Sequence, residues 1–516
     1  MTHSEKKLDV LFVEANSSEE AYQELSHSYS AVETPTWSLL LAQSCRSKGY
    51  GVAILDCVAE RLSLSQAALK IRSLDARLVV FVVYGQNPNS GTTNMIGANK
   101  LARKLKEISP EHKTCFVGSH VSALPKEVLS YPWVDFVLQN EGVYALWNLL
   151  KTNLESTDQL EKVKGIGYCS PINKDEKAIH LTPPERTVPN ERMDIDLPGY
   201  AWDLLPYDKK PLDLYRSHFW HAGFDHDKRK PFASIYTSLG CRFACDFCMI
   251  NIINRVDNSD GVSSSDSKGM RYWSPAFILK EFEKLAEMGA ETVRISDEMF
   301  FLDKRYFEPL LTGVVDRGIK FNMWAYSRID TVQKRYLELF KKAGINWLAL
   351  GVEAANQEIR TEISKGSFKN VNIKDIIRDV RASDLNIISN YIFGFPNDTI
   401  ETMTQTLNLA LELNTETANM YPFQALPGSP LHLEAKKKGN LPKSLQGYAF
   451  LSYESEPPPT NHITSAEVLR FRDEAWIKYF TNPKHLELID KRFGEVACNN
   501  VKDMAKIRLK RKILGD

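Results

Sequence analysis

Three cysteines stand close together in the segment "SLGCRFACDFCMIN", residues 238–251. Cys241, Cys245 and Cys248 follow the spacing C-x3-C-x2-C, and no fourth cysteine stands nearby. Thiolates are ligands for zinc and for iron-sulfur clusters, and this spacing lets one loop curl around a single metal centre. The segment therefore predicts a metal site with three protein sulfurs, and its fourth ligand has to be explained.

Three kinds of site use closely spaced cysteines. Tetrahedral zinc would need a fourth ligand such as His221 or His226, but both precede a whole predicted strand, whereas structural zinc sites pair close ligands. A disulfide is disfavoured by the odd number of thiols. A cubic 4Fe-4S cluster has four irons that each need a terminal ligand, so three cysteines leave one iron open. We favour this cluster, with a substrate or cofactor on the open iron.

Composition describes a multidomain globular protein. The chain has 516 residues, of which 43% are hydrophobic, and 65 Lys and Arg balance 65 Asp and Glu. This balance gives no general reason to expect nucleic acid or an anionic membrane as partner. The N-terminal "MTHSEKKLDVLFVEA" lacks the apolar region of a secretory signal, and no run approaches the roughly 20 apolar residues of a membrane span. We expect a cytoplasmic protein.

Short apolar runs alternate with amphipathic patterns over residues 1–155. We predict strands within residues 8–15, 51–56, 76–84, 114–119 and 134–139, with helices between them. Strand and helix in alternation imply an α/β fold with a parallel, Rossmann-like (flavodoxin-like) sheet, whose ligands lie beyond the carboxyl ends of the strands. The chain has no G-x-G-x-x-G motif, so a dinucleotide has little support.

The rest of the chain divides into three parts. Residues 156–230 are rich in Pro, Asp and aromatic residues and predict a linker. Residues 231–440 resume the alternation with six strand-like segments, which indicate a partial (β/α)6 TIM barrel, since the closed form needs eight. Residues 441–516 predict a small helical region that either caps the barrel or serves as scaffold.

The cysteine motif resembles that of the radical S-adenosylmethionine superfamily. The resemblance covers residues 231–435 and rests on the C-x3-C-x2-C spacing, on Phe247 before the last cysteine, and on the position at the end of the first barrel strand. It implies that the open iron binds S-adenosylmethionine, whose reductive cleavage yields a 5′-deoxyadenosyl radical. An external one-electron donor such as flavodoxin or ferredoxin is implied as well.

Four further segments resemble the places where this superfamily contacts S-adenosylmethionine. "RISDEMF" corresponds to the motif that meets the amino group, "YSRID" to contacts with ribose and carboxylate, "LGVEAANQEI" to a G-x-E segment near the ribose, and "NYIFGFPNDT" to the adenine contact. The implied residues are Asp297, Glu298, Ser327, Arg328, Glu353 and Ile392.

These residues also have structural explanations. Asp297 and Glu298 are placed to cap the following helix, and Arg328 can form a salt bridge on the barrel. Glu353 is harder to explain in this way, because a carboxylate at the end of a buried strand needs a partner.

The first 155 residues resemble cobalamin-binding domains fused ahead of such barrels. The segments "GSHVSALP" and "QNEGV" correspond to G-G-P-H-x-x-x-x-P and G-E-G-E of the commoner version. The implied cofactor-binding residues are Gly118, Ser119, His120, Glu141 and Gly142, with Gln86, Asn87 and Thr92 from the amide-rich loop "YGQNPNSGTTN". Loop capping is the alternative for Gln86 and Asn87.

The chain has no D-x-H-x-x-G, the motif whose histidine ligates cobalt in the methionine-synthase type of domain. The resemblance therefore implies cobalamin without a histidine lower ligand, and the absence of cobalamin stays open. A single histidine such as His120 is more often a hydrogen-bonded core or rim residue than a metal ligand.

Together the two resemblances imply a class B radical S-adenosylmethionine methyltransferase acting on a small molecule, with methyl transfer from methylcobalamin to an unactivated carbon or phosphorus centre. A tetrapyrrole-cyclase-like enzyme without net methyl transfer is the alternative. A methylthiotransferase would bring further clustered cysteines, and a sensor would bring an output module; the sequence shows neither.

Overall fold

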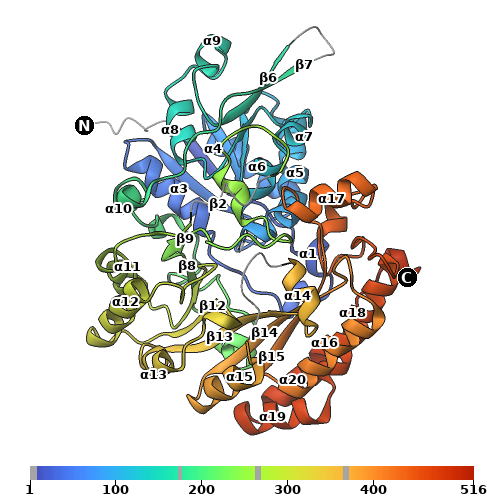
Figure 1. The fold of residues 1–516 in the computed structure, drawn as a ribbon. Helices are drawn as coiled ribbons and strands as arrows, with labels where there is room; N and C mark the ends of the chain where they lie inside the picture. The colour runs from blue at the N-terminus through green and yellow to red at the C-terminus, as the bar shows by residue number, and fades with distance from the viewer. Residues whose placement is uncertain (1–7, 86, 172–176, 262–268, 364–370) are drawn as a thin grey trace.

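The computed structural model describes residues 8–85, 87–171, 177–261, 269–363 and 371–516. Two sheets follow one another along the chain, and the helices of the C-terminal region lie beside the second sheet (Figure 1). The predicted α/β class, with a Rossmann-like sheet followed by a partial barrel, is confirmed. No helix among these residues is long and apolar enough to cross a membrane.

The N-terminal sheet has the strand order β2-β1-β3-β4-β5-β6-β7. Its first five strands are parallel: β1 (Val10–Glu14), β2 (Val52–Asp56), β3 (Leu78–Val82), β4 (Thr114–Val117) and β5 (Phe136–Leu138). Successive residues of each strand point to opposite faces of the sheet. On one face Val10 and Phe12 pack with α3 (Thr36–Arg46) and α8 (Val143–Leu150). On the other face Leu11 and Val13 pack with α4 (Leu64–Leu74) and α5 (Gly91–Ile108).

The N-terminal sheet extends past the boundary expected at residue 155. Strands β6 (Ile166–Pro171) and β7 (Lys177–Leu181) add an antiparallel pair beside β5. The expected linker thus contributes a hairpin to the sheet before the chain crosses to the barrel.

The second sheet has the order β15-β14-β13-β12-β11-β8, with every neighbouring pair parallel. Its strands are β8 (Phe232–Ile235), β11 (Thr292–Ile295), β12 (Asn322–Arg328), β13 (Ile345–Glu353), β14 (Asn386–Phe393) and β15 (Thr417–Pro422). The intervening helices include α11 (Pro275–Glu287), α12 (Lys304–Asp316), α13 (Leu337–Lys342), α14 (Gln357–Ile363), α15 (Ile373–Ala382) and α16 (Ile400–Leu413). These strands correspond to the six predicted segments.

Other parts of the chain cover the two edges of this open barrel. Thr34 lies beside β8, where its Oγ1 accepts from the Ser234 amide at 2.9 Å and donates to the Ser234 carbonyl at 3.1 Å. At the other edge, Arg472 of α18 (Ser465–Phe480) donates to the carbonyl of Met420 on β15 at 2.6 Å. Helices α19 (Pro483–Phe493) and α20 (Glu495–Met504) follow α18 (Figure 1).

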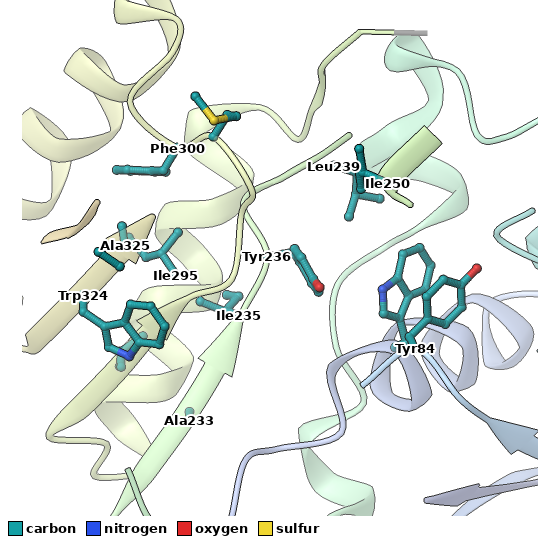
Figure 2. Close-up of a cluster of buried hydrophobic side chains, with 14 of the residues drawn as sticks. Tyr84, Ala233, Ile235, Tyr236, Leu239, Ile250, Ile295, Phe300, Trp324 and Ala325 are labelled. Carbon is teal, nitrogen blue, oxygen red and sulfur yellow. The ribbon is translucent and has the colours of Figure 1, made fainter. Parts of the chain in front are cut away.

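The two sheets share one hydrophobic core. Tyr236, just after β8, lies between the barrel residues around Ile235 and Trp324 and the side chain of Tyr84 from the N-terminal sheet (Figure 2). Tyr84 in turn stacks on Trp37 of α3, with ring centroids 4.2 Å apart. The loops that follow β1 and β3 are therefore held against the carboxyl ends of the barrel strands.

Candidate functional site

A cavity of about 590 Å³ lies between the two sheets. Its lining comes from the loops after β1 and β3, from barrel strands β12 to β15, and from the C-terminal helices. It also includes Cys241, Cys245 and Cys248. Both sheets therefore present the ends at which parallel α/β folds bind ligands.

The cysteine loop begins at a backbone position that requires glycine. Gly240 has φ +93°, and a Cβ there would lie 2.5 Å from the carbonyl oxygen of Gly269. The Cys248 amide donates to the Cys245 carbonyl at 3.1 Å, which turns the loop back on itself. The eight cysteines of the chain are thiols and not disulfides.

The donor set suits a cluster. Burial raises the pKa of the Cys241 thiol to about 12 and also raises that of Cys248. Cys241 and Cys248 are therefore neutral thiols that would become thiolates when a metal centre supplies positive charge. In the protein alone, no three His, Cys, Asp or Glu side chains of the described residues are gathered as a metal site.

Asn89 connects the N-terminal domain to the cysteine loop. Its Nδ2 lies 3.6 Å from Cys248 Sγ, and its Oδ1 accepts from the Met249 amide at 3.0 Å. The sequence interpretation passed over this residue, although it stands in the amide-rich loop from which Asn87 was chosen.

The two neighbouring acids after β11 have different positions. Asp297 is fully buried and does not line the cavity; its oxygens accept from the Thr237 amide and hydroxyl, both at 2.6 Å, and from the Ser238 hydroxyl at 2.5 Å. Burial raises its pKa to about 6, against these hydrogen bonds. Asp297 thus holds the strand that leads into the cysteine loop.

Glu298 lines the cavity, and its Oε2 is buried without a hydrogen-bond partner in the described part of the protein. Burial raises its pKa to about 8, and the neighbouring Asp297 adds to the rise. A neutral carboxyl that lacks a partner is available to a ligand, and it becomes charged if that ligand is cationic.

Arg328 and Glu353 line the cavity at adjacent strand ends. The Arg328 guanidinium pairs with Asp330 at 2.9 Å and lies 3.8 Å from the ring centroid of Phe243 in the cysteine loop. Burial raises the pKa of Glu353 to about 7, although Arg328 counteracts part of the rise. The Glu353 carboxylate lies against Gly351, because a Cβ added at this glycine would lie 2.5 Å from Glu353 Oε1.

The remaining barrel candidates also lie at this wall. Ser327 exchanges a hydrogen bond of 2.7 Å with Thr331, while Phe247 and Ile392 belong to an apolar cluster with Phe395. The rings of Phe247 and Phe395 are 5.7 Å apart. All three candidates line the cavity.

Few N-terminal candidates reach the cavity. Asn87 lines it, and its Oδ1 is buried without a partner among the described residues, whereas Gln86 lies outside those residues. Thr92 and His120 are buried and bond to each other at 3.0 Å. Burial lowers the pKa of His120 to about 3, so the ring is neutral and engaged away from the cavity.

The segments around Gly118 and Glu141 serve packing. Gly118 lies against the backbone of Val83, and Ser119 donates to the Pro88 carbonyl at 2.5 Å. Glu141 forms a buried ion pair with Arg271 and accepts from the Val188 amide at 3.0 Å. Gly142 has φ +77° and starts α8. Of the candidates predicted for cobalamin among the described residues, Asn87 alone lines the cavity.

The sequence interpretation also missed Glu14. It stands at the carboxyl end of β1 and lines the cavity, and burial, with Asp56 nearby, raises its pKa well above the ordinary value. Its signal in the sequence is one acid that ends an otherwise apolar strand.

Two sequence profiles match the chain. Residues 26–150 match the B12 binding domain, and residues 235–410 match the Radical SAM superfamily. The first matched segment contains the loop after β3 and the second contains the cysteine loop, and both loops line the cavity.

Relatives of known sequence span most of the chain. An "uncharacterized methyltransferase" of Pyrococcus horikoshii is 25% identical over 88% of this chain and 89% of its own length. The anaerobic magnesium-protoporphyrin IX monomethyl ester cyclase of Cereibacter sphaeroides is 24% identical over 78% of this chain and 60% of its own length.

The fold matches a solved structure from end to end. The radical S-adenosylmethionine methyltransferase TsrM of Kitasatospora setae, solved with tryptophan and a SAM analogue, superposes with a TM-score of 0.65 over 99% of this chain and 97% of TsrM, at 14% identity. The chain is therefore a radical SAM enzyme that carries an N-terminal B12-binding domain.

Proposed function

We propose that this radical SAM enzyme is a methyltransferase, which transfers a methyl group from cobalamin to an unactivated carbon or phosphorus centre of a small molecule. The observation that carries the proposal is the single cavity lined both by the three cysteines and by the loops after β1 and β3. The similarity to the Pyrococcus methyltransferase over nearly the whole length of both chains supports it.

On this proposal Cys241, Cys245 and Cys248 hold a 4Fe-4S cluster, and a flavodoxin or ferredoxin supplies its electron. The cluster would provide the one-electron reduction that cleaves S-adenosylmethionine. Glu298, whose Oε2 has no hydrogen-bond partner among the described residues, is placed to meet the cationic amino group of that molecule. Arg328 is placed to meet its carboxylate and Glu353 its ribose hydroxyls, as the family resemblance implies, with Ser327, Phe247 and Ile392 beside them.

Cobalamin would supply the methyl group. The Asn87 amide, which has an unpartnered oxygen at the cavity wall, is placed to bind a corrin edge that bears amides. His120 is neutral, hydrogen-bonded and away from the cavity, so we propose that no histidine of the N-terminal domain ligates cobalt from below.

The products of S-adenosylmethionine separate this proposal from a cyclase, the alternative favoured by the similarity to the cyclase of Cereibacter. Enzyme loaded with cluster and cobalamin is incubated anaerobically with S-adenosylmethionine and a one-electron reductant. We expect both 5′-deoxyadenosine and S-adenosylhomocysteine. Deoxyadenosine without S-adenosylhomocysteine would contradict methyl transfer and favour the cyclase.

Asn89 is expected to set how easily the cluster is reduced. Asn89 Nδ2 lies 3.6 Å from Cys248 Sγ and would donate to this sulfur when it holds the cluster. Hydrogen bonds to cluster sulfurs favour the more negative, reduced state. We expect Asn89→Leu to lower the ratio of reduced to oxidised cluster several-fold at a fixed solution potential. A tenfold fall in this ratio corresponds to a shift of about 59 mV in the reduction potential for one electron. Redox titration followed by electron paramagnetic resonance measures it, with Asn87→Leu as control. Equal potentials in the wild type and Asn89→Leu would contradict the role.

The raised pKa of Glu298 predicts a stability that depends on pH. Between the ordinary pKa of 4.5 and the folded value of about 8, the folded protein holds a proton that the unfolded chain releases. Stability therefore falls as pH rises through this range, by about 1.4 kcal/mol for each unit of pKa difference. We expect Glu298→Gln to remove this loss of stability. The urea midpoint of the variant should therefore exceed that of the wild type by an amount that increases from acid to alkaline pH. The exposed Glu308→Gln is the control, and an advantage that is constant with pH would contradict the prediction.

A further inference from the structure

The barrel lumen continues well below the wall that carries Glu298, Arg328 and Glu353. The strand register places Tyr326, Ala349, Ile388 and Thr417 in one layer across four strands. All four line the cavity. Tyr326 precedes Arg328 by two residues on β12, which places this layer about 7 Å deeper than Arg328 at about 3.3 Å per residue.

Small side chains leave this lumen open. The layer above it contains Arg328, Gly351, Asn390 and Asn419, so that β13 contributes Ala349 and Gly351 to successive layers. Closed barrels fill such layers with bulky branched side chains. Here Ala349 and Gly351 carry almost no side-chain volume, and both line the cavity.

Aromatic side chains form the deep walls. They come from the barrel, from the segment before β8, from α1 (Ser18–Tyr22) and from α18, and include Trp324, Trp220, Tyr22, Trp476 and Phe480. The Trp324 indole nitrogen is buried and has no hydrogen-bond partner in the described part of the chain. A ligand with a hydrogen-bond acceptor would satisfy it.

The charges of the deep lumen are already paired. Glu33 lines the cavity, and its carboxylate is bound by Arg294 at 2.6 Å and by His218 Nε2 at 2.9 Å. In the layer above, the Asn419 amide donates to Asn390 Oδ1 at 2.9 Å, and the Arg328 guanidinium pairs with Asp330 at 2.9 Å. Among the described residues, the arginines beside the lumen are thus already bound by carboxylates, Arg294 by Glu33 and Arg328 by Asp330. A buried anion would have to compete with these carboxylates, and burying an unpaired ion costs several kcal/mol.

We infer that the lumen receives an uncharged, largely apolar ring compound with at least one hydrogen-bond acceptor, and that its reacting end points toward the strand ends that carry the cysteines. That this compound is the substrate rests on the proposed function. Its binding to the lumen does not require methyl transfer. The same argument excludes phosphorylated, carboxylated and phosphonate substrates, so it narrows the proposed function to methyl transfer to carbon.

A matched pair of probes tests the inference. Equilibrium dialysis of the anaerobic enzyme, loaded with cluster and cobalamin, compares 2-naphthol with 2-naphthalenesulfonate, which shares the ring system but carries an anionic group. We expect 2-naphthol to bind at least about tenfold more tightly, a difference of about 1.4 kcal/mol. Ala349→Leu and Ile388→Phe, which fill the lumen in two independent ways, should each weaken 2-naphthol by a similar factor.

Tyr207→Ala is the control, because Tyr207 lines a separate aromatic groove of about 610 Å³ between α3 and α11. It should leave the affinity for 2-naphthol unchanged. The inference is overturned if the sulfonate binds as tightly as naphthol, if naphthol does not bind, or if both lumen variants retain the wild-type affinity. S-adenosylhomocysteine formation is measured on the same preparations, so a failure of methyl transfer is seen separately from a failure of binding.

Discussion

Replacing Cys248 with alanine is expected to remove the iron-sulfur cluster and to reduce 5′-deoxyadenosine formation to background. The three cysteines share one loop and one cavity, so a cluster held by three sulfurs would be left with two. Cys248 is also the cysteine that Asn89 contacts, so the variant would lose this contact and keep the hydrogen bond from the Met249 amide to Asn89. Iron per chain, visible absorption and deoxyadenosine by mass spectrometry measure the effect.

Cys169→Ala is the control for this prediction. Cys169 is a partly exposed thiol on β6, which belongs to the N-terminal sheet. We expect full iron content and full deoxyadenosine formation in this variant. Wild-type iron content and cleavage in Cys248→Ala would refute the assignment of the cluster site.

Replacing Glu33 with alanine is expected to destabilise the folded protein by about 3–5 kcal/mol, because it removes the carboxylate partner of a buried cation. Arg294 is fully buried and donates to both oxygens of Glu33, at 2.7 and 2.6 Å. Burial alone would raise the pKa of Glu33, but Arg294 and His218 lower it to about 2, so the carboxylate is charged at neutral pH. Urea denaturation measures the loss.

Two variants make this result specific. Asp203→Ala breaks the exposed pair with Arg46 and should cost less than about 1 kcal/mol. The double variant Glu33→Met with Arg294→Met removes both charges and should recover most of the loss. A cost for Glu33→Ala no larger than that for Asp203→Ala would show that the buried pair does not stabilise the fold.

The barrel could be predicted from sequence because its strands are continuous apolar runs that end in polar or acidic residues. The run "INWLALGVE" is the whole of β13 and ends at Glu353, which lines the cavity. A parallel strand covered on both faces has this pattern, and its carboxyl end is where ligands bind. The position of Glu353 therefore followed from the pattern.

The roles of Asn140 and Glu141 could not be predicted in the same way. Glu141 pairs with Arg271, 130 residues away, and the Asn140 amide donates to the Arg255 carbonyl, 115 residues away. These contacts depend on how the two sheets pack. No local pattern around "QNEGV" reveals that packing, so the segment resembled a cofactor loop while it bridges the two sheets.

The different roles of the neighbouring acids Asp297 and Glu298 could not be predicted either. Asp297 and Glu298 follow one strand, where successive side chains point in opposite directions. Their order in the chain does not decide which of them faces the cavity, because that depends on Thr237 and Ser238, which donate hydrogen bonds to Asp297. The β6 and β7 pair was missed because short antiparallel edge strands carry only a weak apolar signal within a Pro-rich region.

The central claim, methyl transfer through the B12-binding domain, is tested most directly without knowing the substrate. The enzyme is loaded with cluster and reduced cobalamin and given S-adenosylmethionine whose methyl group carries three deuterium atoms. We predict about one equivalent of S-adenosylhomocysteine and of trideuterated methylcobalamin per chain. Unlabelled cobalamin with no S-adenosylhomocysteine, in a preparation that still forms 5′-deoxyadenosine, would contradict the account.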